Sequence, residues 1–179
     1  MYWDKKGKEC TEDTIQAAIQ AAKENGIKYI VVASNTGATA ELFADKDLEI
    51  ICVTHVNGFV NPGENEMTME NRQKLEGLNI KVLTTTHVLS GAERAFSTKF
   101  GGIYPVEIVA NTLRMFGQGV KVGVEIATMA LDSGLIPFGE SIIAVGGTGR
   151  GADSAIIMKP AHAKDILNTK IEEIICKPR

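Results

Sequence analysis

Short apolar runs alternate with helical patterns along the first half of this chain. Residues 11–26 hold the first helical pattern, in which apolar residues recur three or four positions apart: Ile15, Ala18, Ile19 and Ala22. The next run, KYIVVAS at 28–34, is continuously apolar and rich in valine, which is typical of a strand covered on both faces. Similar runs predict strands at 48–55 and 80–87, with a short polar helix at 68–77 between them.

The second half continues this alternation. Pro105 at the first position and Gly117 after the last predict a helix over 105–116. The stretch 119–137 fits both a strand and a helix by periodicity, and its length and terminal Asp-Ser-Gly favour the helix. Two apolar runs, 141–145 and 154–159, predict strands on either side of a glycine-rich connection. The last ten residues fit either a closing strand or a short final helix.

Strands that alternate with helices predict an α/β fold, with a mostly parallel sheet and helices on both faces. The chain has 179 residues, of which 44% are hydrophobic, and this is enough for one sizeable core. No internal repeat, low-complexity stretch or shift in composition divides it. We therefore expect a single domain over residues 1–179.

Charge and cysteine content exclude several classes of function. The formal net charge is −3 and basic residues are not clustered, so we expect no nucleic-acid partner. Three scattered cysteines support neither a disulfide framework nor a zinc site, and no His, Asp or Glu spacing indicates a metal. Without a signal peptide or an apolar run of ~20 residues, the chain is expected to be soluble and cytoplasmic, with no membrane partner.

Small polar residues and glycines follow the predicted strands at their carboxyl ends. In open α/β sheets the ligand crevice lies beyond these ends. We therefore take as candidate binding residues Ser34, Asn35, Thr36, Gly37, Ala38 and Thr39 after the first strand, Thr54, His55, Thr86 and His87 after the next two, and Gly146, Gly147, Thr148, Gly149, Arg150 and Asp153 after the fourth.

The stretch SNTGATA, Ser34 to Ala40, has two interpretations. A glycine at the start of a helix lets the backbone approach an anion, which free N–H groups and nearby hydroxyls then bind. Alternatively, Ser34 or Thr36 simply caps the following helix. The local sequence does not decide between the two.

The same stretch resembles the loop that holds the effector's sugar phosphate in the C-terminal domain of pyruvate kinase. With VTHVNGF, GGTGRGAD and the final CKPR, the whole chain resembles a small family of stand-alone proteins built like that domain. The resemblance implies a three-layer α/β/α fold with a largely parallel sheet of five strands or slightly more. It brings no barrel, metal site or phosphoenolpyruvate site, and it implies flavin mononucleotide (FMN) as ligand, with no assigned reaction.

One departure from that family concerns the charge of the loop. Pyruvate kinases often have Arg or Lys after the loop glycine, whereas this chain has Ala38. We therefore expect Arg150 to supply the positive charge. GGTGRGAD itself is not a dinucleotide fingerprint, because an apolar run and not a helix follows it. It is interpreted either as a flexible hairpin or as a close ligand contact, and we favour the contact.

His55 and His87 follow similar Thr-His-Val sequences and are expected on the same rim. They are candidate catalytic residues, with hydrogen-bonded strand-end residues as the alternative. The favoured function is binding of a small phosphorylated ligand, FMN above all. The alternative is an enzyme, either a flavin-dependent oxidoreductase or a hydrolase or isomerase of a phosphorylated metabolite. Residues 90–102 are expected to form an irregular, mobile flap over the rim. The oligomeric state is left open, a homo-oligomer included.

Overall fold

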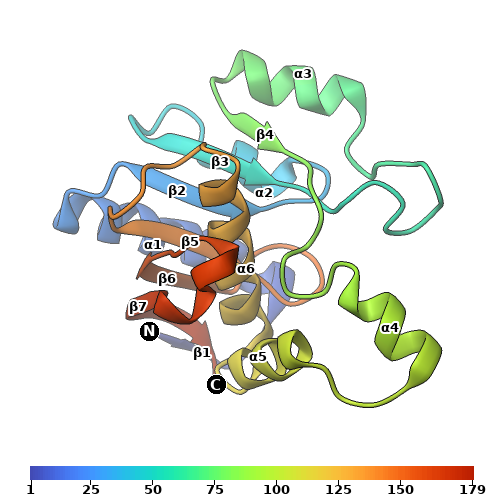
Figure 1. Ribbon diagram of the computed structural model, residues 1–179. Helices are drawn as coiled ribbons and strands as arrows, with labels where there is room; N and C mark the ends of the chain where they lie inside the picture. Colours follow the sequence, from blue (N-terminus) through green and yellow to red (C-terminus); the bar gives the residue numbers. More distant parts are fainter.

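A seven-stranded sheet runs through the centre of the computed structural model, which describes all residues from 1 to 179 (Figure 1). Its strand order is β1-β7-β6-β5-β2-β3-β4. The strands are β1 (Tyr2–Trp3), β2 (Tyr29–Ala33), β3 (Glu49–Val53), β4 (Lys81–Leu83), β5 (Ile142–Gly146), β6 (Ser154–Lys159) and β7 (Lys170–Pro178). Only β6 runs antiparallel to both of its neighbours, and the other four pairs are parallel.

Helices connect most of these strands. They are α1 (Thr11–Asn25), α2 (Ala38–Glu41), α3 (Met69–Gly77), α4 (Glu93–Phe100), α5 (Pro105–Arg114) and α6 (Gln118–Asp132), with 3₁₀ turns η1 (Gly7–Cys10) and η2 (Ala163–Asn168). α1 ends at Gly26, whose positive φ of 63° suits the left-handed cap that glycine adopts easily. The ambiguous stretch at 119–137 is helical, as its length favoured.

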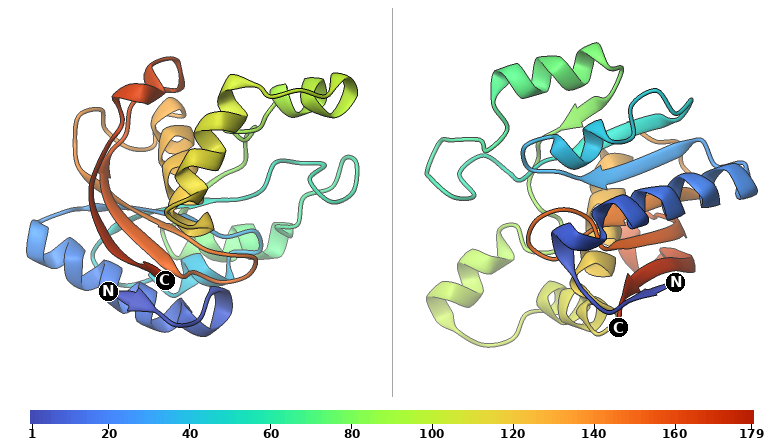
Figure 2. Two further views of the ribbon diagram at one scale, coloured as in Figure 1. Left: turned by 90° about the horizontal axis from the view of Figure 1, so that it is seen from below. Right: turned by 180° about the vertical axis from the view of Figure 1, so that it is seen from behind.

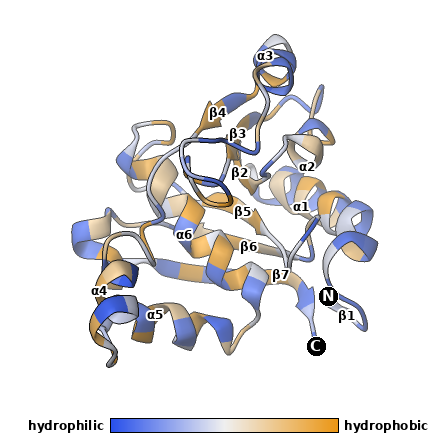
Figure 3. Cartoon of the chain, turned by 90° about the vertical axis from the view of Figure 1, so that its right-hand side faces the viewer, coloured by the Kyte–Doolittle hydropathy of each residue, from blue (hydrophilic) through white to orange (hydrophobic).

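The core is divided into two clusters by the alternation of side chains along the strands. Ile30 and Val32 of β2 belong to one cluster with α1, while Val31 between them belongs to the other cluster with α6. Figure 2 shows α1 and α6 on opposite sides of the sheet. The central strands and α6 are mostly hydrophobic in Figure 3, in keeping with burial on both faces.

The sequence predicted the class correctly and some details wrongly. The α/β fold and the mostly parallel sheet are confirmed, but the sheet has seven strands because residues 2–3 and 170–178 join it at one edge. The strands predicted at 48–55 and 80–87 are shorter, since each ends where its polar residues begin. The prediction of an irregular flap at 90–102 was wrong, because Glu93–Phe100 forms α4.

Four parallel neighbours, β5, β2, β3 and β4, end at one edge of the sheet, which we call the carboxyl edge. Gly146 is the last residue of β5, and all the other candidate binding residues follow these four strands. No helix combines the length and the apolar character needed to cross a membrane.

Candidate functional site

The segment Ser34–Thr39, which we call the open loop, connects β2 to α2. Gly37 begins the helix with a φ of 93°, a conformation that side chains disfavour. The Ser34 hydroxyl accepts a hydrogen bond from the Thr39 N–H at 3.1 Å, so the capping interpretation holds for this serine. Because α2 has only four residues, its dipole contributes little to anion binding.

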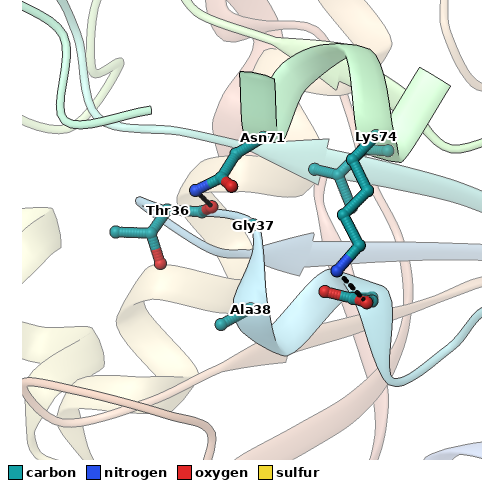
Figure 4. A pocket seen from close by; sticks show the side chains of 7 residues that line it. Thr36, Gly37, Ala38, Asn71 and Lys74 are labelled. Atoms are coloured by element: carbon teal, nitrogen blue, oxygen red, sulfur yellow. Dashed lines mark hydrogen bonds and ion pairs between the residues drawn. The ribbon is translucent and has the colours of Figure 1, made fainter. Parts of the chain in front are cut away.

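A hollow of about 110 Å³ lies beside the open loop (Figure 4). It is lined by Thr36, Gly37, Ala38, Glu41, Asn71, Lys74 and Leu75. The Asn71 side chain donates to the Thr36 carbonyl at 3.0 Å, which ties α3 to the loop. The backbone N–H groups of Gly37 and Ala38 have no acceptor within the chain. The hollow therefore combines two unpaired donors with polar side chains from α3.

The cation at this hollow is Lys74 and not Arg150. The Lys74 ammonium group lies 2.5 Å from a carboxylate oxygen of Glu41, and both side chains are partly exposed. Arg150 is exposed and is not among the residues that line the hollow. Sequence analysis missed Lys74 because it lies in a polar helix 35 residues after the loop, where only the fold brings it close.

We call the glycine-rich segment Gly146–Asp153 the closed loop, because other parts of the chain pack into the space around it. The Asp153 carboxylate is fully buried and accepts three hydrogen bonds: from the Gly7 N–H at 2.8 Å, the Thr148 N–H at 3.0 Å and the Ser154 hydroxyl at 2.8 Å. The Ala152 N–H donates to the Thr11 hydroxyl at 3.1 Å. Asp153 thus fixes the N-terminal segment against the sheet.

The glycines of the closed loop allow backbone to approach backbone. A Cβ at Gly147 would lie 2.3 Å from the Gly151 carbonyl oxygen, and one at Gly146 would lie 2.3 Å from the Gly119 carbonyl oxygen. A Cβ at Gly151 would lie 2.3 Å from the Thr11 hydroxyl. These close approaches explain three glycines without any ligand. Among the candidate residues of this loop, only Gly149 and Arg150 are exposed.

His55 and His87 lie together at the carboxyl edge, as their similar flanking sequences predicted. Their ring centroids are 5.5 Å apart. The exposed ring of Phe59 is 3.8 Å from that of His55 and 5.5 Å from that of His87. We call these three residues the aromatic cluster. Phe59 was missed because an isolated phenylalanine in a polar loop carries no signal in the sequence.

Each histidine has a polar partner that fixes its ring. His55 Nδ1 lies 2.5 Å from a carboxylate oxygen of Glu66. His87 Nε2 accepts a hydrogen bond from the Val56 N–H at 3.3 Å, which requires that this nitrogen carry no proton. Burial lowers the pKa of His87, and this agrees with its role as an acceptor.

The remaining candidate residues at the carboxyl edge differ in whether a ligand could contact them. Thr54 is buried, and its hydroxyl lies 2.6 Å from the Thr84 hydroxyl, which also accepts from the Arg72 guanidinium at 2.8 Å. The Thr54 hydroxyl is therefore hydrogen-bonded inside the protein, whereas Thr86 is exposed and Asn35 is half-buried.

One dipeptide joins the open loop to the aromatic cluster. Glu66 contacts His55, and the next residue, Met67, has its methyl group 3.5 Å from the position of a Cβ on Gly37. The two regions are therefore linked through these consecutive residues.

Comparison with known proteins gives a family match over most of the chain. The model of the pyruvate kinase alpha/beta domain matches residues 12–158. Similar solved structures include a pyruvate kinase from Cryptosporidium parvum, at 19% identity and a TM-score of 0.42, and that organism's pyruvate kinase in complex with ADP, at 18% and 0.42. Each match covers 82% of this chain and 22% of the other, so the chain spans about a fifth of those enzymes.

Proposed function

Because this chain belongs to the family of the pyruvate kinase alpha/beta domain, we propose that it binds the phosphoryl group of a small ligand at the open loop. FMN is the ligand that we propose. The observation that carries the proposal is the hollow beside the open loop, whose lining includes Gly37 and Ala38, with unpaired backbone N–H groups, and Lys74.

The chemistry of the hollow suits a phosphoryl group. Phosphate oxygens accept hydrogen bonds from backbone N–H groups and charge-assisted ones from lysine. Pockets for whole drug-sized ligands have volumes of ~300–1,000 Å³. A hollow of about 110 Å³ therefore suits only the phosphoryl end of a ligand. The pair of Lys74 and Glu41 is partly exposed, and such pairs contribute only ~0–1 kcal/mol, so Lys74 can exchange partners at little cost.

The aromatic cluster suits the other end of FMN. Planar rings stack on aromatic side chains, and the exposed Phe59 ring beside two imidazoles offers such a surface. The neighbouring residues Glu66 and Met67 bring this surface close to the open loop. A bound flavin supplies electron or hydride transfer, while the residues of this chain bind and orient it.

A second candidate function is an enzyme that acts on a phosphorylated metabolite through His55. The observation in its favour is Glu66, which holds one nitrogen of the imidazole and leaves the other for proton transfer. The two candidates are separated by His55→Gln. An enzyme of this kind loses turnover in that variant while it still binds the phosphorylated ligand, and a binding protein shows no turnover in either form.

The test of the proposed function compares FMN with riboflavin, which lacks only the phosphate. We expect FMN to bind at least ~10-fold more tightly, about 1.4 kcal/mol, when affinity is measured by quenching of flavin fluorescence. Lys74→Gln should remove most of this preference. Lys81→Gln is a matched control, because Lys81 forms a similarly exposed pair with Glu49 at the start of β4, at the opposite edge of the sheet.

Two results would contradict the proposal. Equal affinity of the unmodified protein for FMN and riboflavin would show that no phosphate site contributes. Equal loss of preference in Lys74→Gln and Lys81→Gln would show that the effect comes from net charge and not from the hollow.

A further inference from the structure

Residues 93–116, which comprise α4, the connecting segment and α5, form an arm that extends away from the sheet (Figures 1 and 2). α5 packs against α6, but α4 has no buried residue. Polar contacts hold α4 to α5: the Glu93 carboxylate accepts from the Val106 and Glu107 N–H groups at 3.3 and 3.1 Å, and the Ser97 hydroxyl donates to Glu107 at 2.6 Å. The arm thus has a defined shape without a core of its own.

The apolar side chains of the arm are left in water. Six large ones are between 49% and 83% exposed: Phe96, Phe100, Ile103, Ile108, Met115 and Phe116. The Phe96 and Phe100 rings stack on each other with centroids 6.3 Å apart, and the Lys99 ammonium group lies 5.4 Å from the Phe100 centroid, yet both phenylalanines stay more than half exposed. Isolated helices shorter than ~12–15 residues are marginal in water, so an eight-residue helix of this kind needs packing from outside.

We propose that a second copy of this chain covers the arm. If a fully exposed large side chain presents about 200 Å², the six residues expose roughly 800 Å². A stable protein–protein interface buries about 800 Å² on each partner, which the arm alone supplies. Phenylalanine, methionine and arginine, all present in the arm, are enriched in such interfaces.

The charges of the arm favour a copy over other occupants. Its charged residues are Glu93, Arg94, Lys99, Glu107 and Arg114, three basic and two acidic, and they are dispersed among the apolar side chains. A surface of mixed sign can meet itself across a two-fold axis, where the same patch serves both partners, without strong repulsion. An anionic lipid surface or a nucleic acid requires a denser basic face than three dispersed cations provide.

The test is the mass of the whole chain in solution, measured by sedimentation or light scattering between ~1 and ~100 μM. We expect a mass of at least two chains at the upper concentrations. The double variant Phe96→Glu, Phe100→Glu should weaken association by at least ~100-fold, since buried aromatic anchors dominate interfaces. Phe138→Glu is the matched control, because Phe138 is 72% exposed outside the arm. Circular dichroism checks that each variant is folded.

Several outcomes overturn the proposal. A single-chain mass at ~100 μM means that no second copy covers the arm. An oligomer that the double variant leaves intact, or that Phe138→Glu weakens equally, places the interface elsewhere. A monomer that binds vesicles of anionic lipid through the arm assigns this surface to a membrane instead.

Discussion

The open loop and the closed loop both lie at the carboxyl ends of parallel strands, and both combine glycine with small polar residues, yet they differ in what fills the space around them. At the closed loop, Gly7 and Thr11 of the N-terminal segment occupy the hydrogen-bonding groups. At the open loop, the Gly37 and Ala38 N–H groups have no acceptor in the chain, and both residues line a hollow. Glycine and small polar residues thus make internal contacts at the closed loop and line a hollow at the open loop.

This difference shows why a glycine-rich motif does not by itself identify a binding site. Glycine allows a ligand to approach the backbone closely, but it equally allows another segment of the same chain to do so. What distinguishes a binding loop is a set of polar groups that remain without partners after folding. The closed loop also has N–H groups without an acceptor, at Gly149 and Arg150, but at the open loop such groups belong to residues that line a hollow together with Lys74, which makes the open loop the stronger candidate.

The largest effect that follows from the comparison concerns Asp153. Removing its carboxylate by Asp153→Ala leaves two buried N–H groups and a hydroxyl without their acceptor. Hydrogen bonds to charged groups contribute ~1.5–3 kcal/mol each, so we expect a loss of at least about 3 kcal/mol in the free energy of unfolding. Urea denaturation measures it, and Thr36→Ala in the open loop should cost less than ~0.5 kcal/mol. Similar losses in both variants would remove the distinction between the loops.

A smaller effect is expected from two glycines of the closed loop with nearly the same backbone conformation. Gly151 has a φ of 76° and Gly149 a φ of 77°, so Ala is strained at both. A Cβ at Gly151 would meet the Thr11 hydroxyl and the Lys8 backbone, whereas one at Gly149 meets nothing within 4 Å. Gly151→Ala should therefore cost about 2 kcal/mol more than Gly149→Ala in thermal or urea unfolding. Equal costs would indicate that the N-terminal segment does not fill this loop.

The smallest effect is a pH dependence of the free energy of unfolding, caused by His87 at the carboxyl edge. Because burial lowers the pKa of His87 in the folded protein, the unfolded chain takes up this proton first as the pH falls. Stability should therefore decrease from about pH 7 downward, through the ordinary histidine range near 6.5, until the folded pKa is passed. His87→Gln should flatten this slope. The charged groups near His87 are Glu125, which opposes the shift, and His55, Lys121 and Arg94.

The control for this prediction is His162→Gln, since His162 lies on the surface near η2 and pairs with Asp132. If unfolding measured between pH 5 and 8 shows the same slope in the unmodified protein and in His87→Gln, then His87 is not held neutral in the fold.

The sequence predicted those elements whose residues fit only one hydrophobic pattern, either that of a strand or that of a helix. The buried strands β2 and β3 are continuous apolar runs, and Cys52 within β3 is fully buried. Burial also raises the pKa of its thiol to about 12, so Cys52 is inert. The stretch that forms α6 was ambiguous because this helix is buried on most sides, which removes the polar face that marks an amphipathic helix.

The parts that the sequence could not predict depend on tertiary neighbours. The sequence predicts an irregular segment where α4 forms, because glycines bound this short stretch and its apolar residues contribute nothing to the core. Lys74 and Phe59 reach the edge from a helix and a loop whose positions no local pattern gives. The glycines of the two loops could not be told apart, because only the fold reveals that Gly7 and Thr11 fill one of them.

We expect the open loop, and not the closed loop, to bind the phosphoryl group. The most direct test is a titration of isotope-labelled protein with FMN and with inorganic phosphate, followed through the backbone amide resonances by NMR. We predict that the Gly37 and Ala38 amide signals shift most with both ligands, while those of Gly147, Ala152 and Asp153 stay in place. Large shifts at Gly149 and Arg150, with Gly37 and Ala38 unchanged, would contradict the account.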